Sequence, residues 1–177
     1  MSAAHHIAAV ALVAGGLAAL AGCEKGLTDA APPPPLDEAF FRCHVQPILS
    51  KNCATFSCHG TPERYFRLYA RNRLRLGIAS EAQRNSKMNA DERKHNFDAA
   101  RAFIDVDHAE DSLILKKPVE MDAGGWYHGA TKLGTSNIWP NVNQTEYRTI
   151  YKWIKGEKEN DPTCGCGPGC MEPGENQ

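Results

Sequence analysis

The stretch CATFSCHG, residues 53–60, constrains this chain more than any other part of it. Two thiols and an imidazole lie within seven positions, and the histidine directly follows the second cysteine. Thiolates and imidazoles are metal ligands, and thiols also form covalent bonds to cofactors or to each other. The rest of the chain must therefore fold around whatever group these three side chains hold.

The spacing of this stretch is a close variant of C-x-x-C-H, the signature of covalent haem attachment. Two thiols can add to the vinyl groups of a haem as thioethers, and the following imidazole then binds the iron from below. Here four residues, not two, separate the cysteines, so the extra residues must bulge outward. The pattern predicts one haem c, bound covalently by Cys53 and Cys58, with His59 as the proximal axial ligand.

The flanks of this stretch resemble those of the planctomycete-type cytochrome c domains of secreted bacterial proteins. The resemblance spans about 40–156, most loosely over 61–105, and rests on residues 45–60, 112–118, 127–129, 147 and 153–156. It implies a mainly α, small cytochrome c-like helical domain with long loops. It also implies one-electron transfer to redox partner proteins, so that the chain is more an electron carrier than an enzyme.

The amino-terminal segment predicts export and lipid anchoring. Residues 7–20 form an apolar run that is too short to cross a bilayer but suits a signal peptide. The run ends in Leu-Ala-Gly-Cys, which resembles the lipobox of bacterial lipoproteins, with Cys23 as the lipidated residue. A plain secretory signal is the alternative. We expect a protein of the cell envelope, periplasm-facing or on the surface, attached to a membrane through its N-terminal lipid.

Composition divides the chain into four parts. Residues 1–22 are the predicted lipoprotein signal peptide, 23–36 a Pro-rich linker, 37–160 the cytochrome c-like domain and 161–177 a tail rich in Cys, Gly and Pro. The 20 basic and 21 acidic residues give a net charge of -1, which gives no reason to expect a nucleic-acid partner.

Three helices are expected in the globular part. The first follows Asp37 as a cap and kinks or breaks near Val45, with Pro47 opening a second short helix, because proline is disfavoured inside a helix. The second begins at Asn89 or a neighbour and places Phe97, Ala100 and Ile104 on one face, with Phe103 beside them. The third starts with a capping box at 143–146 and repeats apolar side chains at Tyr147, Ile150, Tyr151 and Ile154 before Gly156.

The sixth iron position has two candidates in the loop that precedes the last helix. Position in the fold that the resemblance implies leaves Met121 and His128, and the related domains favour His128, with Met121 as the alternative. A third possibility is an open iron site, which would make the protein a peroxidase-like haem enzyme. Candidate residues lining the haem are Phe56, Phe66, Trp126 and Trp139. Arginines between Arg64 and Arg75 either pair with haem propionates, form a docking patch or are simply solvated.

Four cysteines remain after lipidation and haem attachment: Cys43, Cys164, Cys166 and Cys170. An even number in an exported chain predicts two disulfides, for which three connectivities exist. The implied contact between first and last helices favours a bridge from Cys43 to the tail, whereas a metal site in the tail lacks a clear fourth ligand. The main rival interpretation is a haem-free, disulfide-stapled envelope lipoprotein in which Cys53 and Cys58 bridge to other cysteines.

Overall fold

The computed structural model describes residues 35–77, 80–129 and 137–160. The predicted signal peptide, most of the linker and the cysteine-rich tail lie outside these ranges. Helices account for 44% of the described residues, and the only β pairing among them is an isolated bridge between Val119 and Trp139. The described part is therefore mainly α, as the sequence predicts. It contains no helix that is long and apolar enough to cross a membrane.

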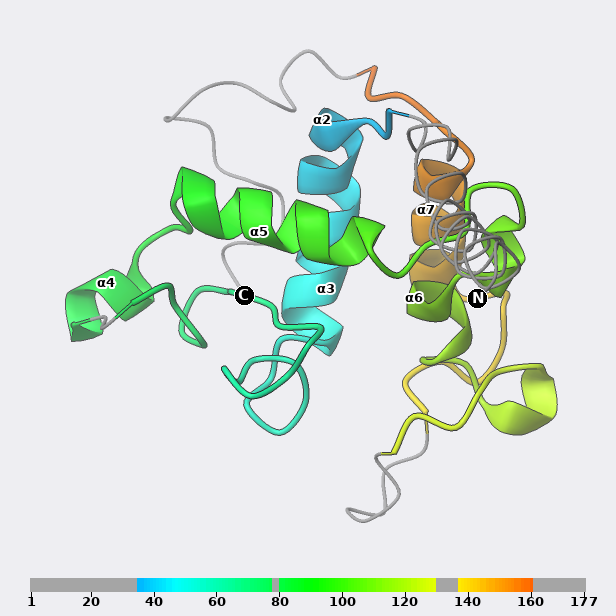
Figure 1. The fold of residues 1–177 in the computed structure, drawn as a ribbon, viewed down its shortest axis with the longest axis horizontal. Helices are drawn as coiled ribbons and strands as arrows, with labels where there is room; N and C mark the ends of the chain where they lie inside the picture. The colour runs from blue at the N-terminus through cyan, green and yellow to red at the C-terminus, as the bar shows by residue number, and fades with distance from the viewer. Residues whose placement is uncertain (1–34, 78–79, 130–136, 161–177) are drawn as a thin grey trace, which may run out of the picture. The chain divides into compact units, whose positions relative to one another are not determined.

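The helical elements follow one another in a simple order (Figure 1). They are α2 (Glu38–Phe40), η1 (Phe41–Val45, a π-helix), α3 (Gln46–Asn52), α4 (Glu81–Asn85), α5 (Ala90–Arg101), η2 (Ala109–Asp111, 3₁₀), α6 (Leu113–Lys116), η3 (Met121–Ala123, 3₁₀) and α7 (Thr145–Ile154).

Asp37 caps the first helical run and Pro47 opens a second short helix, as the sequence predicts, but the chain does not break between them. Asp37 caps it, accepting a hydrogen bond from the backbone N–H of Phe40 at 2.7 Å. The helix type changes from π to α between Val45 and Gln46, and Pro47 lies in the first turn of α3. Inside an α-helix, proline lacks the N–H that would bond to the carbonyl four residues earlier, and its ring clashes with that carbonyl. The wider π-turn before Pro47 lets the helical run continue past it. The three elements α2, η1 and α3 thus deliver the chain directly to Cys53.

Three aromatic side chains join the first, middle and last helices into one core. The ring of Phe41 on η1 lies 5.3 Å from that of Phe97 on α5 and 5.1 Å from that of Trp153 on α7. Trp153 is fully buried, and its indole N–H donates to the backbone oxygen of Asp37 at 3.0 Å. Such aromatic pairs contribute about 0.5–1.5 kcal/mol each beyond their burial. In Figure 1, α5 lies across the α2–α3 run while α7 stands beside it.

Two details of the expected helices are wrong. α5 begins with a capping box from Asn89 to Glu92, as expected, but it ends at Arg101, so Ile104 belongs to the following segment. α7 begins after Gln144, which makes no side-chain cap hydrogen bond, and Asn143 Oδ1 accepts from Arg148. A polar residue near a helix start can bond elsewhere, so the residue type alone does not fix the cap.

Candidate functional site

The cysteine–histidine loop begins where α3 ends. The backbone N–H groups of Cys53 and Ala54 both donate to the carbonyl of Leu49 at 2.9 Å, which closes the helix. The N–H of His59 then donates to the carbonyl of Cys53 at 2.9 Å. The residues between them loop outward, and Phe56 at their tip is 64% exposed. The extra residues of the C-x4-C-H spacing therefore leave the histidine directly beside the first cysteine.

Gly60 allows this loop to close. A Cβ at position 60 would lie 2.1 Å from the carbonyl oxygen of Ala54, closer than any side chain can approach. The Gly60 N–H also donates to the neighbouring carbonyl, Thr55 O, at 2.8 Å. The glycine is needed here because the backbone passes so close to the preceding turn.

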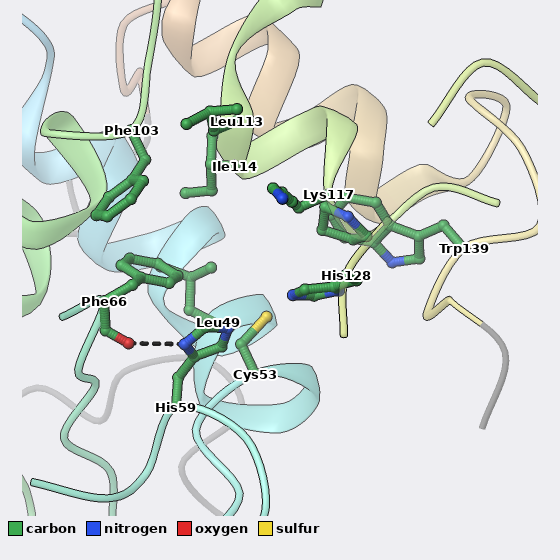
Figure 2. A pocket seen from close by; sticks show the side chains of 11 residues that line it. Leu49, Cys53, His59, Phe66, Phe103, Leu113, Ile114, Lys117, His128 and Trp139 are labelled. Atoms are coloured by element: carbon green, nitrogen blue, oxygen red, sulfur yellow. Dashed lines mark hydrogen bonds between the residues drawn. The ribbon is translucent and has the colours of Figure 1, made fainter. Parts of the chain in front are cut away.

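A single hydrogen bond orients the imidazole of His59. Its Nδ1 lies 2.7 Å from the backbone oxygen of Phe66. A carbonyl only accepts, so Nδ1 carries the proton and Nε2 keeps a free lone pair. The Phe66 ring packs edge-on against the imidazole at 4.8 Å between centroids. Figure 2 shows the result, with the imidazole directed into a pocket.

This pocket is walled mainly by apolar side chains. The cavity between them has a volume of about 180 Å³ and is open to solvent on one side. The segments that contribute come from α3, the cysteine–histidine loop, α6 and the chain before α7. The lining residues are Leu49, Cys53, His59, Phe66, Phe103, Leu113, Ile114, Lys117, Pro118, His128 and Trp139.

His128 enters the same pocket from a distant part of the chain (Figure 2). Its ring centroid lies 5.9 Å from that of His59, with 29° between the ring planes. Burial lowers the pKa of both imidazoles. At His59 the hydrogen bond to Phe66 O raises the pKa, but burial outweighs it, with His128 and Arg64 lowering it further. At His128 the pKa is lowered further by Lys117 and Arg64. Neutral imidazole is the form that binds a metal, so both rings are ready to act as ligands near neutral pH.

The chain that leads to His128 is held in place by backbone hydrogen bonds and by close packing of a glycine. Glu120 N–H donates to Trp139 O at 2.9 Å, and Trp139 N–H donates to Pro118 O at 2.8 Å. Gly125 packs so tightly on Val119 that a Cβ there would lie 1.8 Å from the Val119 oxygen. Although most of this segment is irregular, its backbone is therefore fixed where it approaches the pocket.

The two cysteines of the loop occupy different environments. The Cys53 side chain is buried in the pocket wall, and burial raises the pKa of its thiol to about 12, with Cys58 adding to the rise. Cys58 is partly exposed and is not among the residues that line the pocket. Both are free thiols.

Cys43 behaves differently from these two, because it is disulfide-bonded. Its partner lies outside the described residues, as do Cys23, Cys164, Cys166 and Cys170. Pairing with the tail therefore stays a prediction.

The alternative sixth ligand and two of the expected lining residues lie away from the pocket. Met121, on η3, is 59% exposed, and it does not line the pocket. Phe56 and Trp126 are also exposed and do not line the pocket, whereas Phe66 and Trp139 do. Among the candidates for the second axial position, only His128 reaches the pocket within the described ranges.

The arginine-rich segment contains a structural ion pair that sequence reasoning missed. Arg75 Nε and Nη2 donate to the two carboxylate oxygens of Glu92 at 2.8 and 2.9 Å, and both side chains are almost fully buried. Arg75 also donates to the carbonyls of Arg84, Ser86 and Lys87, which end α4 and lead into α5. Arg75 is thus neither a propionate ligand nor a solvated side chain. A buried Glu in an otherwise polar helix start gave no sequence signal.

Comparison with models of known protein families, with curated proteins and with solved structures finds no match to this chain. Within the described residues, no three His, Cys, Asp or Glu side chains gather in a way that could hold a metal ion by themselves. The site offers two imidazoles instead. Such a pair suits a metal whose remaining ligands come from an organic ring.

Proposed function

We propose that this protein is a monohaem c-type cytochrome that carries single electrons in the cell envelope. The observation that carries the proposal is the facing pair His59 and His128 in an apolar pocket, next to the buried sulfur of Cys53. One of the two imidazoles comes from the C-x4-C-H stretch itself, and the other from a segment far along the chain.

The residues present fit a haem on three counts. An iron bound by two imidazoles at about 2 Å from each nitrogen separates their ring centroids by roughly 6 Å, close to the 5.9 Å between His59 and His128. The pocket lining is dominated by carbon atoms, as a porphyrin requires. The indole N–H of Trp139 is buried in the pocket wall without a hydrogen-bond acceptor, so a ligand with an acceptor suits the site.

Each chain segment has a defined task in this proposal. Cys53 and Cys58 would hold the haem covalently, and His59, whose tautomer Phe66 O fixes, would be one protein ligand of its iron. His128 would be the second protein ligand, and the apolar wall would limit the access of water to the site. When bound, the haem supplies a one-electron Fe(III)/Fe(II) couple, and two imidazole ligands favour a lower potential than a thioether ligand does.

The competing functions have less support. A haem-free, disulfide-stapled module needs Cys53 and Cys58 in disulfides, yet both are free thiols while Cys43 is bonded. A peroxidase-like enzyme needs an open iron position, and His128 lies where it would close that position. Lipid attachment at Cys23, a membrane-tethered envelope location and redox partner proteins remain part of the proposal on sequence grounds.

A pyridine haemochrome spectrum tests the proposal on protein produced in cells that attach haem c. We expect one haem per chain, retained after acid–acetone extraction because thioether bonds survive it. His59→Ala should abolish the native spectrum. His128→Ala should convert a low-spin ferric spectrum to a high-spin one while the haem stays attached.

His108→Ala is the matched control for these variants. His108 is exposed, does not line the pocket, and pairs through its side chain with Asp105. Its spectrum should equal that of the unchanged protein. A colourless product from the unchanged chain would contradict the proposal, and so would a low-spin spectrum that survives His128→Ala.

A further inference from the structure

The indole of Trp139 presents a buried hydrogen-bond donor without an acceptor. The side chain is 3% exposed, and its Nε1 has no hydrogen-bond partner in the described part of the chain. Trp153 provides the contrast, because its equally buried indole donates to Asp37 O at 3.0 Å. A buried N–H without a partner is unfavourable and rare. This donor is therefore placed for an acceptor that a ligand brings.

The orientation of this donor is fixed before any ligand arrives. The backbone of Trp139 is bonded on both sides, through its N–H to Pro118 O at 2.8 Å and through its oxygen to Glu120 N at 2.9 Å. Its ring meets that of Tyr147 edge-to-face, at 6.1 Å and 83°. An indole held by its backbone and by a neighbouring ring has little freedom to find another acceptor.

A positive charge shares this wall of the pocket. Lys117 directly precedes Pro118 and lines the pocket, and its Nζ donates to Tyr127 O at 2.9 Å. An ammonium has three donors, so further N–H bonds remain available to a ligand. Figure 2 shows Lys117 and Trp139 on the same side of the pocket, close to His128.

We propose that Trp139 and Lys117 form a carboxylate subsite that binds one haem propionate. The inference rests on the proposed function, since it assumes that haem occupies the pocket. A haem is a flat apolar body whose strongest hydrogen-bond acceptors are its two propionates. An indole N–H beside an ammonium offers one of them a charge-assisted pair of bonds. The other titratable groups that line the pocket are Cys53, His59 and His128, and Arg64 lies outside the lining but near enough to affect both imidazoles.

This assignment differs from what the arginine pattern of the sequence suggests. Arg75 is committed to Glu92, and Arg64 is exposed outside the pocket lining. The subsite would instead hold one propionate beside the chain that leads into α7, where Trp139 lies.

The test uses the reduced, diamagnetic holoprotein labelled with ¹⁵N in tryptophan. We expect a nuclear Overhauser effect between the Trp139 indole proton and the methylene protons of one propionate. In resonance Raman spectra, the propionate bending band should shift in both Trp139→Phe and Lys117→Met. Trp126→Phe is the control, because that side chain is about half exposed and does not line the pocket, and the propionate band of this variant should stay in place.

The outcomes separate the inference from the proposed function. A holoprotein with two imidazole ligands that shows neither the Overhauser effect nor a band shift overturns the carboxylate subsite alone. A chain without covalent haem overturns both. If Trp139→Phe does not fold, the Overhauser effect in the unchanged protein and the band of Lys117→Met still decide.

Discussion

Replacing Glu92 with glutamine should remove a large part of the stability of this domain. The Glu92 carboxylate accepts two hydrogen bonds from Arg75, one from Leu76 N and one from Asn89 N, each between 2.8 and 2.9 Å. Glutamine keeps the shape but leaves the Arg75 guanidinium buried without a counter-charge. Breaking a buried pair in this way costs about 3–5 kcal/mol. Domains of this kind are stable by only about 5–15 kcal/mol.

Urea unfolding followed by circular dichroism measures this loss. Lys94→Gln is the control on the same helix, since the exposed Lys94–Asp98 pair, at 2.5 Å, should contribute no more than about 0.5 kcal/mol. We expect the midpoint of Glu92→Gln to fall sharply while the slope stays constant. A loss below about 1 kcal/mol would refute the reasoning, because a buried guanidinium cannot be left unpaired so cheaply.

The stability of the domain should also fall in acid as Glu92 becomes protonated. Burial alone would raise the pKa of Glu92, but the hydrogen bonds from Arg75, Leu76 and Asn89 outweigh it and hold that pKa below its ordinary value. The folded state therefore binds this proton less readily than the unfolded chain does. The stability that Glu92 provides is complete above the unfolded-state pKa, about 4.3, and is lost as the pH falls through the lower, folded-state pKa. Glu92→Gln should lack this part of the acid transition.

Three further predictions concern the site. In folded, haem-free protein, iodoacetamide should label Cys58 but spare Cys53, because burial raises the pKa of the Cys53 thiol to about 12; equal labelling without denaturant would count against it. Gly60→Ala should lower the yield of haem-loaded protein, since its Cβ would meet Ala54 O at 2.1 Å, and a normal yield would show that the loop can open. By NMR, His59 of haem-free protein should titrate below about 6.5, and a higher midpoint would mean that the ring is solvated.

The parts predictable from sequence are those that depend on neighbours along the chain. Asp37 and Asn89 are helix caps because their short polar side chains reach backbone donors three residues ahead. The place of His59 beside Cys53 is also local, since one backbone hydrogen bond closes the loop between them. By contrast, the approach of His128 was expected only from a family resemblance.

The parts that could not be predicted depend on partners far apart in sequence. Asn96 is fully buried, with its amide bonded to Tyr69 and to Gln46 Oε1, 50 residues earlier. From sequence alone, a polar side chain on a helix is expected to be exposed, because its distant hydrogen-bond partners are not known. The same holds for the pairing of Arg75 with Glu92. Trp126 and Trp139 likewise look alike in sequence, and only the bridge at Val119 puts one of them in the pocket wall.

The π-turn at η1 fixes the direction in which the side chains of α3 and of Cys53 point relative to the aromatic core. The Gln46 N–H reaches back five residues to Phe41 O, so this turn holds more residues than an α-turn would. Deleting one residue here would restore an α-helix and rotate the downstream half by about 100° relative to the aromatic core. Cys53 would then swing out of the wall that it shares with the imidazoles. A single-codon deletion between two well-formed helical halves would therefore disable the site without removing any residue that lines it.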